Sequence, residues 1–307
     1  MGLEDTSKIE AGNLFKVNGL VAVVTGGGSG LGRMMARALA ANGAFKVFVI
    51  GRREGPLNEA ASSVPGGTII PIVGDITSKD SLQACVDQVK QYVDAVDVLI
   101  ANSGVSGPSV PVLDENQESL PLLQLAKNMW KPSPEAINST YAVNITGVHF
   151  TVAAFLPLLH EANLKRPQPP CLENFKPRPQ IITIGSVGAF RRNPLANLSY
   201  GPSKAGVTHL TKSLATTLVP YDIRANVICP GFYYSEMTHD MFKAQGKLGI
   251  HDTEGTFPKA ALPATRAGNE QDLAGVVLWL CSRGGAYVNG CTVVTDGGLL
   301  SICPASY

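Results

Sequence analysis

A glycine-rich run stands between an apolar segment and an alanine-rich segment near the start of the chain. Residues 25–32 read Thr-Gly-Gly-Gly-Ser-Gly-Leu-Gly, and the apolar residues 20–24 directly before them favour a strand. We expect Gly26 to allow a tight turn, Gly30 to let an anion approach the backbone, and Gly32 to let the following helix pack close to the strand. Phosphate groups would then face the free N–H groups at the start of that helix. This order of strand, turn and helix predicts a parallel α/β fold that binds a dinucleotide.

A tyrosine and a lysine lie four residues apart in the second half of the chain, within the sequence Ser-Tyr-Gly-Pro-Ser-Lys. On a helix, Tyr200 and Lys204 would stand on the same face, one turn apart. A phenol with an ordinary pKa of about 10 exchanges protons poorly at neutral pH. An ammonium beside it would lower the pKa of that phenol. The pair therefore predicts an acid/base catalyst, although a tyrosine packed on an amphipathic helix would have the same spacing.

Together, the two motifs resemble those of the short-chain dehydrogenase/reductase family, which carries Thr-Gly-x-x-x-Gly-x-Gly near its N-terminus and Tyr-x-x-x-Lys in its second half. The resemblance extends from about Lys16 to Leu300. The segment Ala-Asn-Ser-Gly at residues 101–104 is similar to the family's Asn-Asn-Ala-Gly and departs from it at Ala101 and Ser103. The resemblance implies a Rossmann-like, doubly wound sheet of seven mainly parallel strands with helices on both faces.

The resemblance also implies an activity, which is hydride transfer between a nicotinamide cofactor and a carbonyl carbon. Tyr200 would donate the proton, Lys204 would lower the pKa of Tyr200 and bind the nicotinamide ribose, and Ser186 would hydrogen-bond the substrate oxygen. Asn144 would hold a water molecule that links Lys204 to solvent. The residues implied in cofactor binding are Thr25, Gly26, Gly28, Ser29, Gly30, Leu31, Gly32, Arg52, Arg53, Asp75, Ile76, Asn102, Ser103, Gly104, Tyr200, Lys204, Pro230, Gly231 and Thr238.

The end of the second expected strand indicates which cofactor the chain uses. A carboxylate there would bind the ribose 2′-hydroxyl of NAD, but this chain has Gly51 followed by Arg52. Because a guanidinium pairs well with a phosphate, this sequence favours NADP(H) over NAD. The alternative is that Arg52 is a solvated surface charge.

Apolar and aromatic residues in the loops expected over the nicotinamide suggest the wall of a substrate site. They are Val187, Phe190, Phe232 and Tyr233. A moderately large, partly apolar ketone or secondary alcohol, of the kind found in secondary or fatty-acyl metabolism, fits such a wall. The sequence leaves other chemistry on the same fold open, namely imine reduction, dehydration, a directed cyclisation, or a non-catalytic module that senses NADP.

Alternating apolar and helical segments continue along the chain without a repeat or a disordered linker, which favours one Rossmann-fold domain over residues 1–307. The expected strands are 21–25, 46–50, 68–73, 96–101, 181–185, 223–229 and 291–295, and the longest expected helical stretch is 134–161. Two segments are longer than this architecture needs, 105–132 and the proline-rich 164–179, and residues 231–265 are expected to form the substrate loop. Because ligands bind beyond the carboxyl ends of the strands in such sheets, the motifs should converge at one edge.

The composition excludes several classes of partner. The formal net charge is +1 and no basic run exceeds two residues, so neither a nucleic acid nor a membrane is expected to bind. Six cysteines lack the spacing of metal ligands, so we expect reduced, mostly buried thiols and no metal. With no apolar signal core and no stretch expected to span a bilayer, the expected compartment is the cytoplasm.

An apolar helix at 271–281 beside an edge strand predicts a homodimer or homotetramer. The other expected partner is a small-molecule carbonyl or alcohol substrate.

Overall fold

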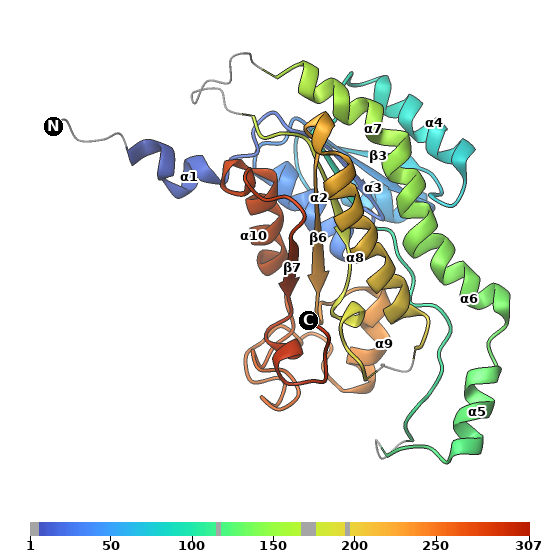
Figure 1. Cartoon of the computed structure of the whole chain (residues 1–307). Coiled ribbons are helices and arrows are strands. Elements are labelled where there is room, and N and C mark those ends of the chain that lie inside the picture. The colour runs from blue at the N-terminus through green and yellow to red at the C-terminus, as the bar shows by residue number, and fades with distance from the viewer. Residues whose placement is uncertain (1–5, 115–117, 167–175, 194–196) are drawn as a thin grey trace.

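The computed structural model describes residues 6–114, 118–166, 176–193 and 197–307 (Figure 1). These residues contain one sheet of seven parallel strands in the order β3-β2-β1-β4-β5-β6-β7. The strands are β1 (Val21–Thr25), β2 (Lys46–Gly51), β3 (Ile69–Val73), β4 (Val98–Ala101), β5 (Gln180–Ile184), β6 (Arg224–Pro230) and β7 (Thr292–Thr295). The predicted Rossmann-like sheet is confirmed. The prediction was of mainly parallel strands, and all seven strands of the sheet are parallel.

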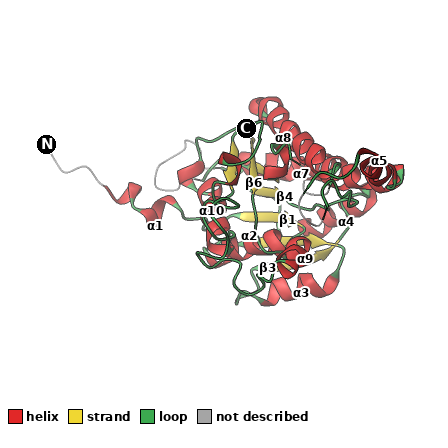
Figure 2. Cartoon of the chain, turned by 90° about the horizontal axis from the view of Figure 1, so that it is seen from below, coloured by secondary structure: helices red, strands yellow, loops and turns green. Residues whose placement is uncertain are grey.

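The central strands β1 and β4 are almost entirely apolar because helices cover both faces of the sheet. Every residue of β1 is buried. The register places Val23 of β1 between Phe48 of β2 and Leu99 of β4, and all three side chains are fully buried. Figure 2 shows the strands in the middle of the molecule with helices on either side of them.

Two sets of helices form the two halves of the core. On one face, α2 (Gly30–Ala41) and α10 (Glu270–Cys281) pack against the sheet, with Met35 and Leu273 in the same cluster as Val24. On the other face, Val89 and Phe155 belong to a cluster with Val23, where α4, α7 and α8 cover the sheet. The remaining bounds are α1 (Ala11–Leu14), α3 (Glu54–Ser62), α4 (Lys79–Lys90), α5 (Leu122–Trp130), α6 (Pro134–Tyr141), α7 (Val148–Leu164), α8 (Tyr200–Thr217) and α9 (Glu236–Ala244).

The longest helical stretch contains a π-helical segment. α6 continues into a π-helix over Ala142–Gly147 and then into α7, so the predicted stretch is confirmed and reaches Leu164. The expectation that no stretch could span a bilayer is wrong by length and composition. The helical stretch Pro134–Leu164 has 31 residues and is long and apolar enough to meet both criteria. Its buried side chains, Phe155 and Leu159 among them, pack against the sheet as core residues do.

The two predicted insertions differ in what the structure describes. Residues 105–132 contain the helix α5, which the prolines of this segment do not indicate. No residue of α5 is buried, and Figure 1 shows this helix beyond the N-terminal end of α6, away from the sheet. Most of the second insertion, residues 167–175, lies outside the described residues, so the extended loop expected there stays a prediction.

Candidate active site

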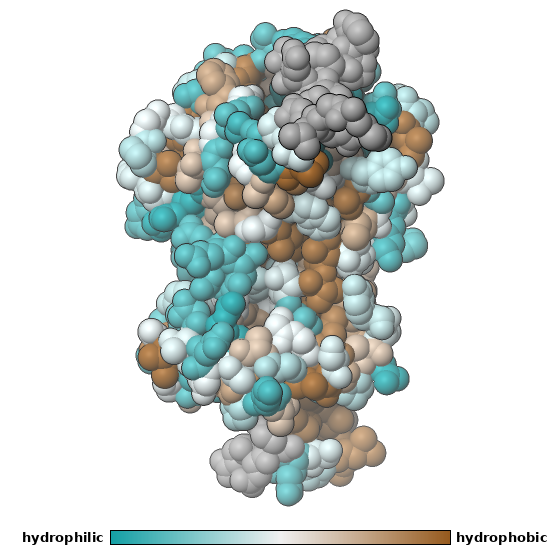
Figure 3. Space-filling view, turned by 90° about the vertical axis from the view of Figure 1, so that its left-hand side faces the viewer, coloured by the Kyte–Doolittle hydropathy of each residue, from teal (hydrophilic) through white to brown (hydrophobic). Residues whose placement is uncertain are grey.

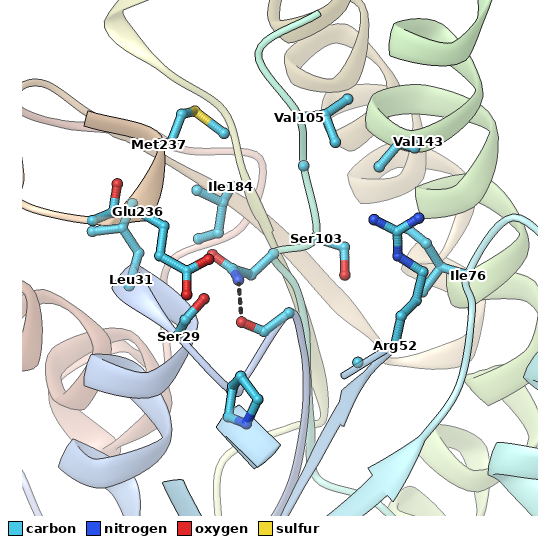
Figure 4. A pocket seen from close by; sticks show the side chains of 18 of the residues that line it. Ser29, Leu31, Arg52, Ile76, Ser103, Val105, Val143, Ile184, Glu236 and Met237 are labelled. Carbon is cyan, nitrogen blue, oxygen red and sulfur yellow. Dashed lines mark hydrogen bonds between the residues drawn. The ribbon is translucent and has the colours of Figure 1, made fainter. Parts of the chain in front are cut away.

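A cavity of about 580 Å³ lies at the carboxyl ends of the parallel strands (Figure 4). Segments that follow β1 to β6 all contribute to its lining, as the common polarity of the strands requires. The predicted site residues that line it are Gly26, Gly28, Ser29, Gly30, Leu31, Arg52, Arg53, Asp75, Ile76, Asn102, Ser103, Gly104, Ser186, Tyr200, Lys204, Pro230, Gly231, Tyr233 and Thr238. The predicted residues outside this lining are Thr25, Gly32, Asn144, Val187, Phe190 and Phe232.

Side-chain hydrogen bonds tie the turn after β1 to the end of β4. The Thr25 hydroxyl accepts hydrogen bonds from the backbone N–H groups of Asn102 (3.1 Å) and Ser103 (3.2 Å). The Asn102 amide donates in turn to the carbonyl oxygens of Thr25 (2.9 Å) and Gly26 (3.2 Å). Gly32 lies so close to the Gly26 carbonyl that a Cβ would not fit. Thr25 and Gly32 therefore shape the glycine turn from behind, without facing the cavity.

The N-terminal end of α2 opens toward the cavity. Its N-cap residue, Ser29, makes no side-chain capping hydrogen bond, and the first turn carries no acidic residue. Ser29, Gly30 and Leu31 all line the cavity. Because the first N–H groups of a helix have no partners within the helix and attract anions, this end fits the pyrophosphate of a dinucleotide.

Ser186, Tyr200 and Lys204 come together where β5 ends and α8 begins. Ser186 lies two residues after the end of β5, while Tyr200 and Lys204 lie on the first turn of α8 and the next. The Lys204 ammonium donates to the Ile184 carbonyl oxygen at 2.7 Å and lies 5.8 Å from the centre of the Tyr200 ring. The spacing predicted from the sequence thus does place the phenol and the ammonium on one helix face.

Asn144 lies behind this cluster, fully buried in the π-helical segment. Its side-chain oxygen accepts from the N–H of Val105 (2.9 Å), and its amide donates to the Val105 carbonyl (3.0 Å). The same amide donates to the Ser203 hydroxyl (2.9 Å), which donates to the Tyr200 carbonyl (2.7 Å). Asn144 therefore links the segment after β4 to the first turn of α8.

Burial shifts the pKa of both members of the tyrosine–lysine pair toward the neutral side chain. It raises the pKa of the Tyr200 phenol, a change that a hydrogen bond with Ser186 opposes. It lowers the pKa of the Lys204 ammonium to about 8. Loss of water around the phenol thus outweighs the Ser186 hydrogen bond, which alone would lower the pKa of Tyr200. A lowering of this pKa by Lys204 stays a prediction.

Asn197 fixes the start of α8, a role that sequence analysis missed. Its side-chain oxygen accepts from the backbone N–H groups of Ser199 and Tyr200, each at 3.0 Å. Its amide donates to the Ser106 carbonyl, which joins the segment after β4 to α8. Because Ser199 and not Asn197 holds the N-cap position, the usual N-cap preference does not point to Asn197, whose contacts are those of a local Asx-type turn.

The two arginines after β2 have different surroundings. Arg53 forms an ion pair with Glu236, with Nη2 and Oε2 2.6 Å apart. In Figure 4, Arg52 lies on the side of the cavity opposite Glu236. Hydrogen bonds from the backbone and side chain of Thr77 lower the pKa of the Asp75 carboxyl, and the charge of Arg52 adds to this effect.

The four residues predicted to wall the substrate site lie in three environments. Val187 packs in a satellite core with Phe232 and Phe242, which belong to the predicted substrate loop. Tyr233 lines the cavity, is buried, and shares a 2.6 Å hydrogen bond with the Thr295 hydroxyl. Phe190 contacts the ring of Tyr307 edge-on at 5.0 Å between centroids.

The start of α9 contributes lining residues, of which sequence analysis missed Ser235 and Glu236. Ser235, Glu236 and Met237 all face the cavity. Ser235 is the N-cap of α9 in a capping box with Thr238, whose hydroxyl also donates to the Tyr233 carbonyl at 2.7 Å. The sequence does carry a signal for this helix start. Ser235 is followed three residues later by Thr238, and a polar side chain at that spacing is typical of a capping box.

A parallel sheet, a dinucleotide-shaped cavity with an open helix end, and an adjoining Ser-Tyr-Lys cluster define a Rossmann-fold oxidoreductase. Among the described residues, no group of three His, Cys, Asp or Glu side chains is placed to hold a metal ion. A sequence profile described as short chain dehydrogenase matches residues 20–246. The chain therefore belongs to the short-chain dehydrogenase/reductase family.

Named relatives agree with this assignment along the whole chain. The chain is 42% identical over 303 residues to the short-chain dehydrogenase/reductase PhomF of Diaporthe leptostromiformis, covering 98% of both chains. It is 28% identical to the 3-oxoacyl-[acyl-carrier-protein] reductase FabG of Haemophilus influenzae, covering 92% of this chain and 99% of the other. Among solved structures, the RhlG/NADP active-site complex of Pseudomonas aeruginosa superposes with a TM-score of 0.73 at 26% identity, covering 93% of this chain and 98% of that one.

We expect the buried lysine to make stability depend on pH. Because burial lowers the pKa of Lys204 from 10.5 to about 8, the folded chain binds fewer protons at this site than the unfolded chain between those values. The difference in the free energy of unfolding between the wild type and Lys204→Met should therefore change in favour of the wild type as the pH rises from about 8 to 10.5. This gain should disappear as the pH falls back toward about 8. Denaturant unfolding of both chains without cofactor at several pH values measures this difference. A difference that does not change with pH would contradict the lowered pKa.

Proposed function

We propose that this protein is an NADP(H)-dependent ketoreductase or alcohol dehydrogenase, acting as one domain over residues 1–307. The observation that carries the proposal is the meeting of Ser186, Tyr200 and Lys204 in one cavity that is also lined by the open end of α2 and by Arg52. Dinucleotide and carbonyl substrate would thus lie in one continuous space. The dinucleotide, when bound, supplies the hydride chemistry.

The protein's own residues would supply and guide the proton. A raised pKa keeps the Tyr200 phenol protonated at neutral pH, which suits a proton donor to the carbonyl oxygen. Ser186 would donate a second hydrogen bond to that oxygen as negative charge develops on it. Lys204 would hydrogen-bond the nicotinamide ribose. Because the side chain of Asn144 is hydrogen-bonded to Val105 and Ser203, we assign it the role of positioning α8. The water molecule that Asn144 would hold stays a prediction.

The surroundings of the adenosine ribose support NADP(H) over NAD. Gly51 stands where a carboxylate would bind the 2′-hydroxyl, and Arg52 follows it at the cavity wall. A guanidinium at this place would pair with a 2′-phosphate. The similar RhlG structure is named as a complex with NADP, which agrees with this choice.

The substrate class that fits best is a moderately large, partly apolar ketone or secondary alcohol of secondary or fatty-acyl metabolism. The cavity that contains Ser186, Tyr200 and Lys204 is also lined by the apolar side chains of Val105, Val143 and Met237 (Figure 4). Relatives support the same class, because FabG is named as a 3-oxoacyl reductase. Reduction of such carbonyls in the presence of NADPH is the direct test.

Replacing the proposed proton donor should abolish turnover and spare binding. Tyr200→Phe removes only the transferable proton, so NADPH oxidation over a panel of ketones should fall by about a hundredfold or more. The dissociation constant for NADPH should stay within about twofold of the wild-type value, because the ring remains in place. The exposed Tyr221→Phe serves as the matched control and should leave both quantities unchanged. Retention of more than about a tenth of the wild-type rate by Tyr200→Phe would reject Tyr200 as the acid.

Reversing the charge of Arg52 should weaken the preference for NADPH. Arg52→Asp puts an anion where the 2′-phosphate would lie, so the ratio of the dissociation constants for NADH and NADPH should fall about tenfold or more. Fluorescence titration with each dinucleotide measures this ratio. Lys90→Asp, at the exposed end of α4, changes the net charge equally and should leave the ratio as it is. An unchanged ratio in Arg52→Asp would mean that Arg52 does not contact the phosphate.

We further propose that the protein is a cytoplasmic homodimer or homotetramer that pairs through β7 and α10. β7 is the last strand of the sheet, and its residues are only partly buried. Figure 3 shows the side of the molecule where β7 and α10 lie, with a band of apolar side chains on it. The chain after β7 runs toward the segment that follows β5, where Ala305 forms an isolated antiparallel β-bridge with Arg191. A second copy would cover the open edge.

Sedimentation at micromolar concentration should give a mass of at least twice 32.3 kDa. Gly275 lies exposed on α10 with open space around it, so Gly275→Glu should fit within one chain and lower the mass toward that of a monomer. Gly55 on α3 has equally open surroundings, and Gly55→Glu is the matched control. The mass of a single chain for the unaltered protein would reject the oligomer. A larger mass that Gly275→Glu does not change would place the interface elsewhere.

A further inference from the structure

An ion pair joins two separate walls of the cavity. Arg53 is the N-cap residue of α3 and follows β2, whereas Glu236 is the first residue of α9, 183 positions later. Their nearest side-chain atoms are 2.6 Å apart, and both residues line the cavity. Figure 4 shows the Glu236 side chain on the same side of the cavity as Ser29. The pair therefore spans the cavity between the β2–α3 connection and the substrate loop.

The end of α9 that carries Glu236 is held in place by contacts of its own. Ser235 and Thr238 form a capping box at the start of this helix. Ser235 also packs against the glycine turn, since a Cβ on Gly30 would come within 2.9 Å of the Ser235 Cβ. The ion pair thus adds a direct contact between the β2–α3 connection and a helix end that its own contacts already order, so the two charged groups face each other from ordered positions.

The charges of the pair suit a site for an anionic ligand. An unpaired carboxylate beside the open end of α2 would repel a pyrophosphate, and Arg53 compensates the charge of Glu236. Arg52, on the opposite side of the cavity, stays available for a 2′-phosphate. The two consecutive arginines would then have separate tasks.

We propose that Arg53 and Glu236 form a clasp across the dinucleotide site and that opening of this clasp limits the rate at which the cofactor leaves. The proposal rests on the proposed function in one respect, that the cavity holds NADP(H). Both side chains are about 60% exposed, with relative exposures of 61% and 59%, so the pair has the modest strength of a surface ion pair. Its loss should speed release about two- to fivefold, and salt should weaken it.

The release of NADPH and of NADH can be measured by stopped-flow fluorescence, with excess oxidised cofactor as the trap and no substrate present. The proteins compared are wild type, Glu236→Gln, Arg53→Glu, Glu236→Arg and the double variant with the two charges exchanged. Asp94→Asn breaks a comparable exposed ion pair with Lys165, far from the cavity in the fold, and is the matched control. Each protein is measured at low and at high salt.

The clasp predicts that the three single variants release both dinucleotides faster than the wild type. The double variant with the exchanged charges should restore slow release. High salt should speed release from the wild type but not from Glu236→Gln. Asp94→Asn should behave as wild type. Two results would overturn the clasp. One is faster release of NADPH alone in Arg53→Glu without restoration by the exchange, which would mean that Arg53 binds the 2′-phosphate directly. The other is release rates that none of the variants changes. Failure of wild type to bind either dinucleotide would instead reject the proposed function and the clasp together.

Discussion

The parallel pairing of β1 with β4 is the constraint on which the candidate site depends. The chain adds β2 and β3 on one side of β1 and then crosses to add β4 to β7 on the other. The segments that leave β1 and β4 must therefore diverge to opposite faces of the sheet, which opens a crevice at their carboxyl ends. Thr25 and Asn102 hold the two strand ends together across this crevice. The glycine turn, the open end of α2 and the Ser-Tyr-Lys cluster all take their places from this arrangement.

The cluster of Ser186, Tyr200 and Lys204 combines burial with hydrogen bonds to neighbouring groups. Removing water from Tyr200 and Lys204 disfavours the charged form of each, so the phenol keeps its proton and the lysine titrates near pH 8. The Ile184 carbonyl provides the buried ammonium with an acceptor. Asn144 and Ser203 satisfy the polar groups behind the pair, which avoids the cost of leaving them unpaired. A reacting carbonyl would therefore meet a protonated phenol that is already held in place.

The sequence predicts the features that depend on local pattern and misses those that depend on tertiary contact. Apolar runs and the glycine turn predict the parallel sheet, and the four-residue spacing places Tyr200 and Lys204 on one face of α8. The sequence does not indicate that burial raises the pKa of Tyr200, because burial cannot be read from two residues on a helix. The Arg53–Glu236 ion pair joins residues 183 positions apart, and no local pattern indicates such a partner. The helix α5 was missed because the prolines around it favour an extended chain.

The π-helical segment over Ala142–Gly147 sets the rotational phase between the two helices that it connects. A π-turn holds more residues than an α-turn, and each added residue turns the following side chains by about 100° around the axis. The widened turn thus lets α7 direct one face at the sheet while Asn144 points toward Val105 and α8. Homologous chains that differ by a single residue in this turn would present a different residue to α8, even where every flanking motif is shared. Length at this position is therefore as informative as residue identity when such chains are aligned.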